Sequence, residues 1–410
     1  MQVKEMIIAR SVTRIILLTV FGLVLGLIVC EVTLRVAGIS YPIFDTWDYD
    51  RAIALRPHKK GWYRNEGAAH LEINGLGYRD RDHPQKKNRD ELRIAFIGDS
   101  FTEARQVEID KTFWRLIENS KLLTDAHPGY KVITLNFGIG GYGTVQEYIT
   151  LKRDVLHLDP DLVVLMLFMG NDFINNSPKL SRVAYDDFRP FYELKSGNLQ
   201  ADNSFRNLTL TNVRKRFLLE ASHHLRLLEL VNQVRRVFAA SRVEDAPRNE
   251  PIDFDGMPGI FSGHFVPPKS EAWQMAWNLT EAVLEKAVAD VRQSGAEFLL
   301  VAIPTPMQVH PEPKEARAIQ TQAGLEDLLY PDRRLAAHAQ RFGYAFLSLT
   351  EPFIDEVATT GTYLHGFENH LGIGHWNENG HAIAARAILA SIIKNGLLPP
   401  KQHSVPPKSN

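Results

Sequence analysis

A repeated order of strand, helix and strand constrains this chain more than any other feature. Short, mostly apolar runs occur at residues 92–98, 130–138 and 160–170, and amphipathic stretches typical of helices separate them at 111–123 and 144–158. Runs without polar alternation are typical of parallel strands that helices cover on both faces. Because parallel strands need a crossover connection, this order predicts a doubly wound α/β sheet.

The pattern breaks after the third strand and resumes later. Residues 173–268 contain no comparable apolar run, whereas two further strands with their helices are predicted at 296–304 and 344–350. The sheet is therefore expected to have five strands. We interpret 173–268 as an insertion that caps the carboxyl edge of this sheet.

The N-terminal region contains a second strong signal. Residues 15–30 carry no charge, and Lys4, Arg10 and Arg14 precede them. A spanning helix needs about 20 apolar residues, which the apolar tail beyond Glu31 completes. Basic residues before the apolar run predict a cytoplasmic N-terminus and an extracytoplasmic remainder. The predicted organisation is a cytoplasmic N-terminus at 1–14, a transmembrane anchor at 15–37, a lead-in at 38–90, an α/β domain at 91–396 and a disordered tail at 397–410.

Three other interpretations of this apolar run are less favoured. A cleaved signal peptide would need a small-residue cleavage site of the A-x-A type, and none is evident. A lipoprotein would need a small residue before Cys30, where Val29 stands. A buried soluble helix is rarely apolar on every face. We therefore expect a single-pass membrane protein whose main domain is periplasmic or on the cell surface.

Composition excludes some classes of function. The formal net charge is −1, with 47 basic and 48 acidic residues, so no basic excess indicates nucleic-acid binding. The single cysteine rules out a disulfide framework. Four histidines fall close together, but they form no H-E-x-x-H pattern, and we predict no metal and no cofactor. These histidines are His365, His370, His375 and His381.

Polar and glycine-rich blocks follow the predicted strands. The first strand ends in Gly-Asp-Ser at 98–100, the second continues into Asn-Phe-Gly-Ile-Gly-Gly-Tyr-Gly at 136–143, and the third ends in Gly-Asn-Asp at 170–172. The block Gly-His-Trp-Asn-Glu-Asn-Gly-His follows much later, at 374–381. Ligands of open parallel sheets bind beyond the carboxyl ends of the strands. A serine at such a place is otherwise a common helix N-cap, which is the structural alternative for Ser100.

The order of these blocks resembles that of the SGNH hydrolases, also called the GDSL esterase/lipase family. The resemblance implies a three-layer α/β/α sandwich of flavodoxin-like type with a five-stranded parallel sheet. It also implies hydrolysis or transfer of ester-linked acyl groups. The matching positions make Ser100 the nucleophile and His375 the general base. They place the oxyanion hole at the backbone N–H groups of Ser100 and Gly141 and at the side-chain amide of Asn171.

One departure from the family pattern concerns the acid that orients the base. The family usually has an aspartate three, sometimes two, residues before the histidine, where this chain has Gly372 and Ile373. Either a main-chain carbonyl orients the histidine, as in some members of the family, or an acid comes from elsewhere in the chain, with Glu368 and Asp355 as the candidates. Weak or absent catalysis is the remaining alternative.

Three hypotheses for function follow. The first is a membrane-anchored serine esterase that acts on small acyl esters, such as O-acetyl groups of a cell-envelope glycan. The second is an O-acyltransferase that uses the same site on such a glycan. The third is a non-catalytic glycan-binding protein on the same scaffold, which the missing acid favours.

Overall fold

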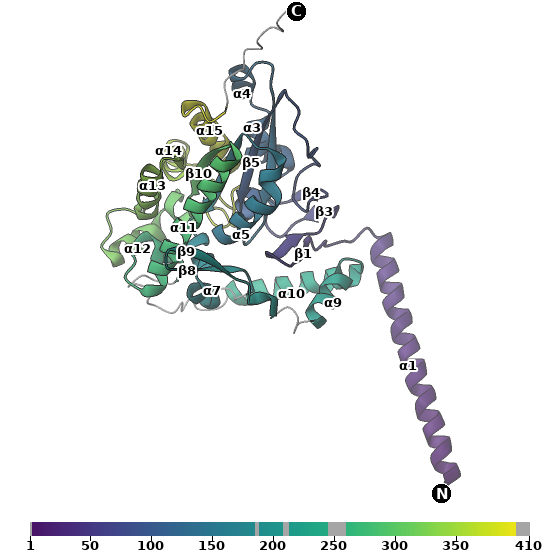
Figure 1. Ribbon diagram of the computed structural model, residues 1–410. Helices are drawn as coiled ribbons and strands as arrows, with labels where there is room; N and C mark the ends of the chain where they lie inside the picture. The colour runs from purple at the N-terminus through teal and green to yellow at the C-terminus, as the bar shows by residue number, and fades with distance from the viewer. Residues whose placement is uncertain (1, 185–187, 208–212, 245–259, 399–410) are drawn as a thin grey trace, which may run out of the picture. The chain divides into compact units, whose positions relative to one another are not determined.

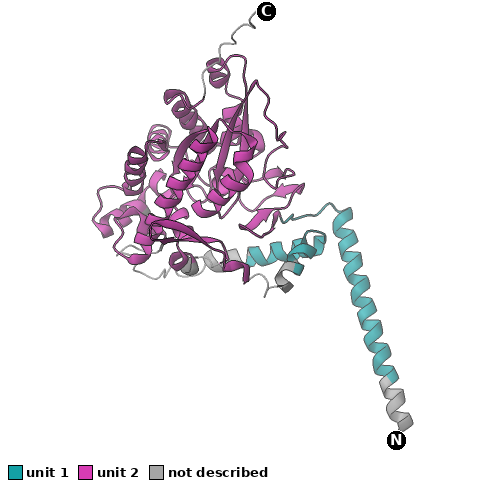
Figure 2. Ribbon diagram, in the orientation of Figure 1, with its two compact units in different colours: residues 1–43, 212–247 teal, residues 44–211, 248–410 magenta. Residues whose placement is uncertain are grey.

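The computed structural model describes residues 2–184, 188–207, 213–244 and 260–398. Figure 2 shows that the chain forms two compact units. Unit 1 combines residues 1–43 with 212–247, and unit 2 combines 44–211 with 248–410. The predicted tail at 397–410 lies outside the described residues from 399 onward.

A five-stranded parallel sheet forms the centre of unit 2, as the strand pattern predicted. The strand order is β11-β10-β7-β5-β6, so the chain starts in the interior of the sheet and winds outward in both directions. In register, Ile94 pairs with Thr134 on one side and with Leu162 on the other. The strands are β5 (Glu91–Gly98), β6 (Lys131–Gly138), β7 (Leu162–Phe168), β10 (Glu297–Ile303) and β11 (Ala345–Ser348).

Helices cover both faces of the sheet, which gives the three-layer α/β/α sandwich (Figure 1). Successive side chains of a strand point to opposite faces. Ala95 and Ile97 of β5 accordingly belong to one apolar cluster, and Ile94 and Phe96 belong to the other. The first face is covered by α5 (Thr144–Thr150), α11 (Glu271–Ser294) and α13 (Tyr330–Phe342), and the second by α3 (Phe113–Glu118), α14 (Thr350–Thr360) and α15 (Glu378–Lys394).

Shorter elements complete unit 2. The further α-helices are α2 (Ser100–Glu103), α4 (Lys121–Ala126), α6 (Asp172–Asn176), α7 (Pro178–Ala184) and α12 (Lys314–Ala323). Short 3₁₀ or π turns lie at Ile109–Lys111, Leu151–Val155, Leu156–Leu158, Ile260–Phe265 and Pro306–Val309. The antiparallel hairpins pair β1 (Asp45–Asp48) with β2 (Ala52–Leu55), β3 (Lys60–Tyr63) with β4 (Ala69–Glu72), and β8 (Phe191–Lys195) with β9 (Asn198–Asp202).

The segment 173–268 differs from the expectation of a single insertion. It contains the hairpin β8–β9, whose two-residue turn at Ser196 and Gly197 has positive φ at both positions, as a tight hairpin turn requires. Neither strand was expected, because both are short and mostly exposed rather than apolar. The segment is also divided, because residues 212–247 belong to unit 1.

Unit 1 consists of three described helices. Helix α1 (Gln2–Val36) contains the predicted anchor, and its part from Arg10 to Val36 is long and apolar enough to cross a membrane. Helices α9 (Val213–Ser222) and α10 (Arg226–Glu244) come from the middle of the sequence.

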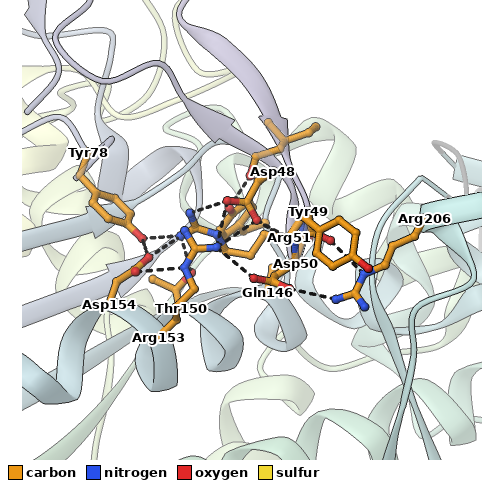
Figure 3. A network of polar contacts seen from close by, with 12 residues as sticks. Asp48, Tyr49, Asp50, Arg51, Tyr78, Gln146, Thr150, Arg153, Asp154 and Arg206 are labelled. Atoms are coloured by element: carbon orange, nitrogen blue, oxygen red, sulfur yellow. Dashed lines mark hydrogen bonds and ion pairs between the residues drawn. The ribbon is translucent and has the colours of Figure 1, made fainter. Parts of the chain in front are cut away.

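The lead-in is tied to the sandwich through a buried arginine (Figure 3). Arg51 follows β1, and its guanidinium contacts Asp48 at 3.1 Å, Asp154 at 2.8 Å and the hydroxyl of Tyr78. Its backbone carbonyl accepts a hydrogen bond of 2.7 Å from the Gln146 side chain on α5. Because a buried cation is costly unless it is paired, this network fixes the lead-in against the end of α5.

We predict that Arg51→Met lowers the free energy of unfolding by about 3 kcal/mol, because it leaves two partly buried acidic partners without this cation. Urea denaturation followed by tryptophan fluorescence measures this loss. Arg153→Gln is the matched control, since Arg153 also pairs with Asp48, at 3.0 Å, but its side chain is 37% exposed. The control should lose less than about 1 kcal/mol. Equal losses for both variants would contradict the structural role of Arg51.

Candidate active site

Ser100 lies directly beyond the carboxyl end of β5, at the first position of α2. The N-cap of this helix is Asp99, whose Oδ1 accepts a hydrogen bond of 2.9 Å from the Phe101 N–H. Ser100 is therefore not the cap, and its hydroxyl is available for another contact. The first N–H groups of a helix have no partner within the helix.

The Ser100 hydroxyl contacts an imidazole from a distant part of the sequence. Its Oγ lies 2.8 Å from Nε2 of His375, which is 275 residues away. His375 precedes α15 in a loop that is closed by a bridge between His365 and Trp376 and by a 2.8 Å hydrogen bond from the Gly366 N–H to the His375 carbonyl. The structure thus brings together the two side chains that the sequence motifs singled out.

The other side of the imidazole contacts Glu66, from the lead-in. Oε2 of Glu66 lies 2.5 Å from Nδ1 of His375, and Oε1 accepts a hydrogen bond of 2.7 Å from the His375 backbone N–H. Burial alone lowers the pKa of His375, but the hydrogen bond and the negative charge of Glu66 outweigh this effect, so its pKa lies above the usual value. Burial acts in the opposite sense on Glu66, where the contact with His375 prevails and the pKa of the carboxyl is lowered.

The two glycines beside His375 explain why the acid comes from this direction. Gly374 has a φ of +77°, and a Cβ there would lie 2.2 Å from Oε1 of Glu66. Gly372 has a φ of +86°, and a Cβ there would lie 2.2 Å from Nε2 of His310. An aspartate at position 372 would therefore overlap His310, whereas Gly374 leaves room for Glu66 to approach the backbone.

The acids considered from the sequence lie elsewhere. Glu368 is solvent-exposed in the loop before His375, and Asp355 is exposed on α14. Among the described residues, the carboxylate hydrogen-bonded to His375 is that of Glu66. No local signal marked Glu66, which is 309 residues from His375 and lies in the lead-in, outside the predicted α/β domain.

Two of the three residues predicted to form the oxyanion hole, Ser100 and Asn171, line one cavity. A cavity of about 660 Å³ is lined by Ser100, Asn171 and His375, among others. The Asn171 side chain also hydrogen-bonds the Asp99 carboxyl. Gly141 is not among the lining residues. Its neighbour Gly140 lies close to Ser100, since a Cβ on Gly140 would lie 3.6 Å from the Cβ of Ser100.

The remaining lining of the cavity is largely apolar. Phe168, Met307 and Ile373 contribute hydrophobic surface, and Thr305 and Lys314 contribute polar groups. Such a space beside a paired serine and imidazole can hold a substrate with both apolar and polar parts.

Three buried carboxyls lie behind Ser100. Burial raises the pKa of Asp99, Glu147 and Asp172; the charge of Asp99 further raises the pKa of the other two, and the charge of Glu147 further raises that of Asp172. Asp172 accepts a hydrogen bond of 3.1 Å from the Phe168 N–H, so it holds the end of β7 in place. These groups support the strand ends that carry Ser100 and Asn171.

The histidines near His375 are in different environments. Burial lowers the pKa of His365 and of His381 to about 3, so both stay neutral near pH 7. His370 is exposed. The described part of the chain contains no group of three or more His, Cys, Asp or Glu side chains arranged to hold a metal ion.

Comparison with known proteins gives one family and several similar folds. Residues 94–246 match the model of the family described as GDSL-like Lipase/Acylhydrolase. The acetylxylan esterase Axe2 from Geobacillus stearothermophilus is 14% identical with a TM-score of 0.37, over 73% of this chain and 94% of that one. The acetyl xylan esterase AlAXEase is 13% identical with a TM-score of 0.39, over 73% of this chain and 100% of that one. No curated protein matches the chain.

We predict that Glu66 raises the pKa of His375 in the folded protein. A ¹³C-edited NMR titration of the His375 ring should give a pKa above the usual value of about 6.5. In Glu66→Gln the pKa should fall, because the imidazolium loses its anionic partner. Glu368→Gln is the matched control and should leave the titration unchanged. A shift in the control but not in Glu66→Gln would contradict the assignment.

Proposed function

We propose that this chain is an acyl ester hydrolase of the GDSL-like lipase/acylhydrolase family, in which Ser100 and His375 hydrolyse the ester through an acyl-enzyme intermediate. The observation that carries the proposal is the contact of 2.8 Å between Ser100 Oγ and His375 Nε2. A serine hydroxyl is a weak nucleophile at neutral pH and needs a base within hydrogen-bond reach.

The reaction follows from this contact. Nε2 takes the hydroxyl proton while Ser100 Oγ attacks the ester carbonyl, and the resulting tetrahedral intermediate collapses as Nε2–H protonates the leaving alcohol. Water then attacks the acyl group on Ser100, with His375 again taking a proton and returning it to Oγ. The products are the free acid and the alcohol, and His375 ends neutral as it began.

Glu66 acts through His375 and is a positioning residue. Its carboxylate accepts the Nδ1–H, so that Nε2 is the unprotonated nitrogen that faces Ser100. The negative charge also stabilises the imidazolium that forms during each proton transfer. The hypothesis of a non-catalytic glycan-binding protein drew support from a missing acid, and Glu66 removes that support.

The oxyanion hole is proposed from the N–H of Ser100, the N–H of Gly141 and the amide of Asn171. Asn171 has the strongest support, because it lines the cavity beside Ser100. The assignment of the Gly141 N–H rests on the glycine-rich motif and on the position of the neighbouring Gly140 next to Ser100. Fixed donors of this kind stabilise the charge that develops on the carbonyl oxygen.

The proposed substrate is an acyl ester of an envelope glycan, with O-acetyl as the acyl group. The cavity of about 660 Å³ is larger than an acetyl group requires, so it also has room for part of the alcohol component. The choice of acetyl rests on the proposed location and on the family analogy. Product analysis with an added glycan distinguishes hydrolysis from transfer to a sugar hydroxyl.

The N-terminal helix is proposed as an uncleaved anchor. Its stretch from Arg10 to Val36 has the length and composition of a spanning helix, and the basic residues before it favour a cytoplasmic N-terminus. Unit 2 would then be extracytoplasmic.

Ser100→Ala and His375→Ala should each lower the hydrolysis of p-nitrophenyl acetate by about a thousand-fold or more, because nucleophile and base act as a unit. Initial rates of the full chain in detergent measure this effect. Asn171→Ala should lower kcat by about a hundred-fold through loss of one oxyanion donor. Equal background rates in wild type and in both the Ser100 and the His375 variants would refute the proposed chemistry.

Glu66→Gln should lower kcat by at least about a hundred-fold and move the acidic limb of the pH–rate profile to lower pH. The sign follows because neutral His375 is the active form, and the variant loses the carboxylate that holds the pKa of His375 high. Glu368→Gln and Asp355→Asn are the controls and should keep the profile of the wild type. A wild-type profile for Glu66→Gln would show that another group orients His375.

A further inference from the structure

Glu31 is a charged residue near the end of the apolar helix α1, and its partners are Arg35 on the same helix and backbone groups of another helix. Its carboxylate accepts hydrogen bonds from the N–H groups of Arg226 and Leu227, at 3.1 and 3.0 Å. These are the first two residues of α10. Negative charge is favourable at a helix N-terminus, where the first N–H groups have no partner within the helix. Glu31 therefore caps α10 from a distance of 195 residues in sequence.

Further contacts fasten the start of α10 to the end of α1. Arg35 donates a hydrogen bond of 2.7 Å to the carbonyl of His224, in the turn between α9 and α10. Glu229, which is 4% exposed, accepts hydrogen bonds from the Ser40 hydroxyl at 2.9 Å and from the Tyr41 N–H at 3.1 Å. The first turn of α10 is thus held at several points along residues 31–41.

The spacing of the charged residues along α1 determines how deep in a bilayer these contacts would lie. Arg14 is the last basic residue before the uncharged run, and Glu31 follows it by 17 positions. At about 1.5 Å per residue, the two lie about 26 Å apart along the helix. The hydrocarbon core of a bilayer is about 30 Å thick. With Arg14 at one boundary, Glu31 and the start of α10 therefore lie at the other.

Helix α10 exposes an apolar stripe. Val231, Val234 and Phe238 are 45%, 44% and 65% exposed, and their spacing places them on one face of the helix. Glu229, which contacts the segment after α1, lies on the opposite face by the same helical geometry. The exposed Arg235 flanks the stripe, whereas the exposed Arg236 lies on the side away from it.

We infer that α10 lies in the membrane–water interface, with Val231, Val234 and Phe238 in contact with lipid acyl chains and Arg235 near the headgroups. Within unit 1, α10 runs across the direction of α1 in Figure 1, as a helix in the plane of the interface would beside a spanning helix. An apolar stripe beside a basic residue is the pattern of interfacial helices. The inference rests on the proposed anchoring by α1 but not on the proposed chemistry of Ser100.

Depth-dependent quenching in lipid vesicles tests this placement on the full chain. Cys30 is the single cysteine, so Cys30→Ser gives a background into which Leu23→Cys, Val234→Cys or Arg236→Cys is introduced singly. Each cysteine carries an NBD fluorophore, and the vesicles of phosphatidylethanolamine and phosphatidylglycerol contain lipids with a doxyl quencher at shallow or deep positions. Arg236→Cys is the matched control, because it is exposed on the same helix but away from the stripe.

The inference predicts that the label at 234 is quenched at least about twofold more strongly than the label at 236, with the shallow quencher most effective. The label at 23 should respond most to the deep quencher. Adding Glu31→Gln should weaken the quenching at 234 and leave that at 23 unchanged.

Equal quenching at 234 and 236, with normal quenching at 23, would overturn the interfacial placement alone. Absence of quenching at 23 would overturn both the anchor and this inference. Ester hydrolysis by the same proteins is measured separately, so its failure remains distinguishable from either result.

Discussion

The chain of contacts from Glu66 through His375 to Ser100 is the interaction on which the interpretation of this protein depends. Each member comes from a different segment: the lead-in, the loop before α15, and the turn after β5. The carboxyl end of β5 positions the first of these segments, with Ser100, and the loop between α14 and α15 brings the second, with His375, to it. The third requires that the lead-in be held at a fixed position against the sandwich.

Two buried arginines fix the lead-in. Arg51 pairs with Asp154 beyond α5, and Arg79 donates hydrogen bonds to the carbonyls of Ala104 and Val107, which follow the turn that carries Ser100. Burial of a guanidinium is costly, so both positions are strongly determined by their partners. The lead-in therefore supports the site from two sides, and buried apolar side chains of its hairpins join one of the two apolar clusters of the sandwich.

The sequence predicted the strands and two of the three site residues, but not the third. The five strands were predictable because short, uninterrupted apolar runs are typical of parallel strands that helices cover on both faces. Ser100 and His375 stood in motifs at strand and loop ends, and the structure brings them together. Glu66 stands in no periodic pattern, and its partner is 309 residues away, so the nearest acids in sequence, Glu368 and Asp355, drew attention instead. Contacts of this kind depend on tertiary packing, which neither periodicity nor motif spacing records.

The two glycines before His375 show how a carboxylate from another segment can still contact the imidazole. His310 occupies the space that a side chain at position 372 would need, and Glu66 reaches His375 only because position 374 has no Cβ. The carboxylate then contacts both the ring and the backbone of His375, so that one side chain fixes the imidazole and the loop that carries it. The functional unit therefore begins within the lead-in. The expected boundary at residue 91 marks the start of the sheet, whereas the structural unit that contains the site begins at Phe44.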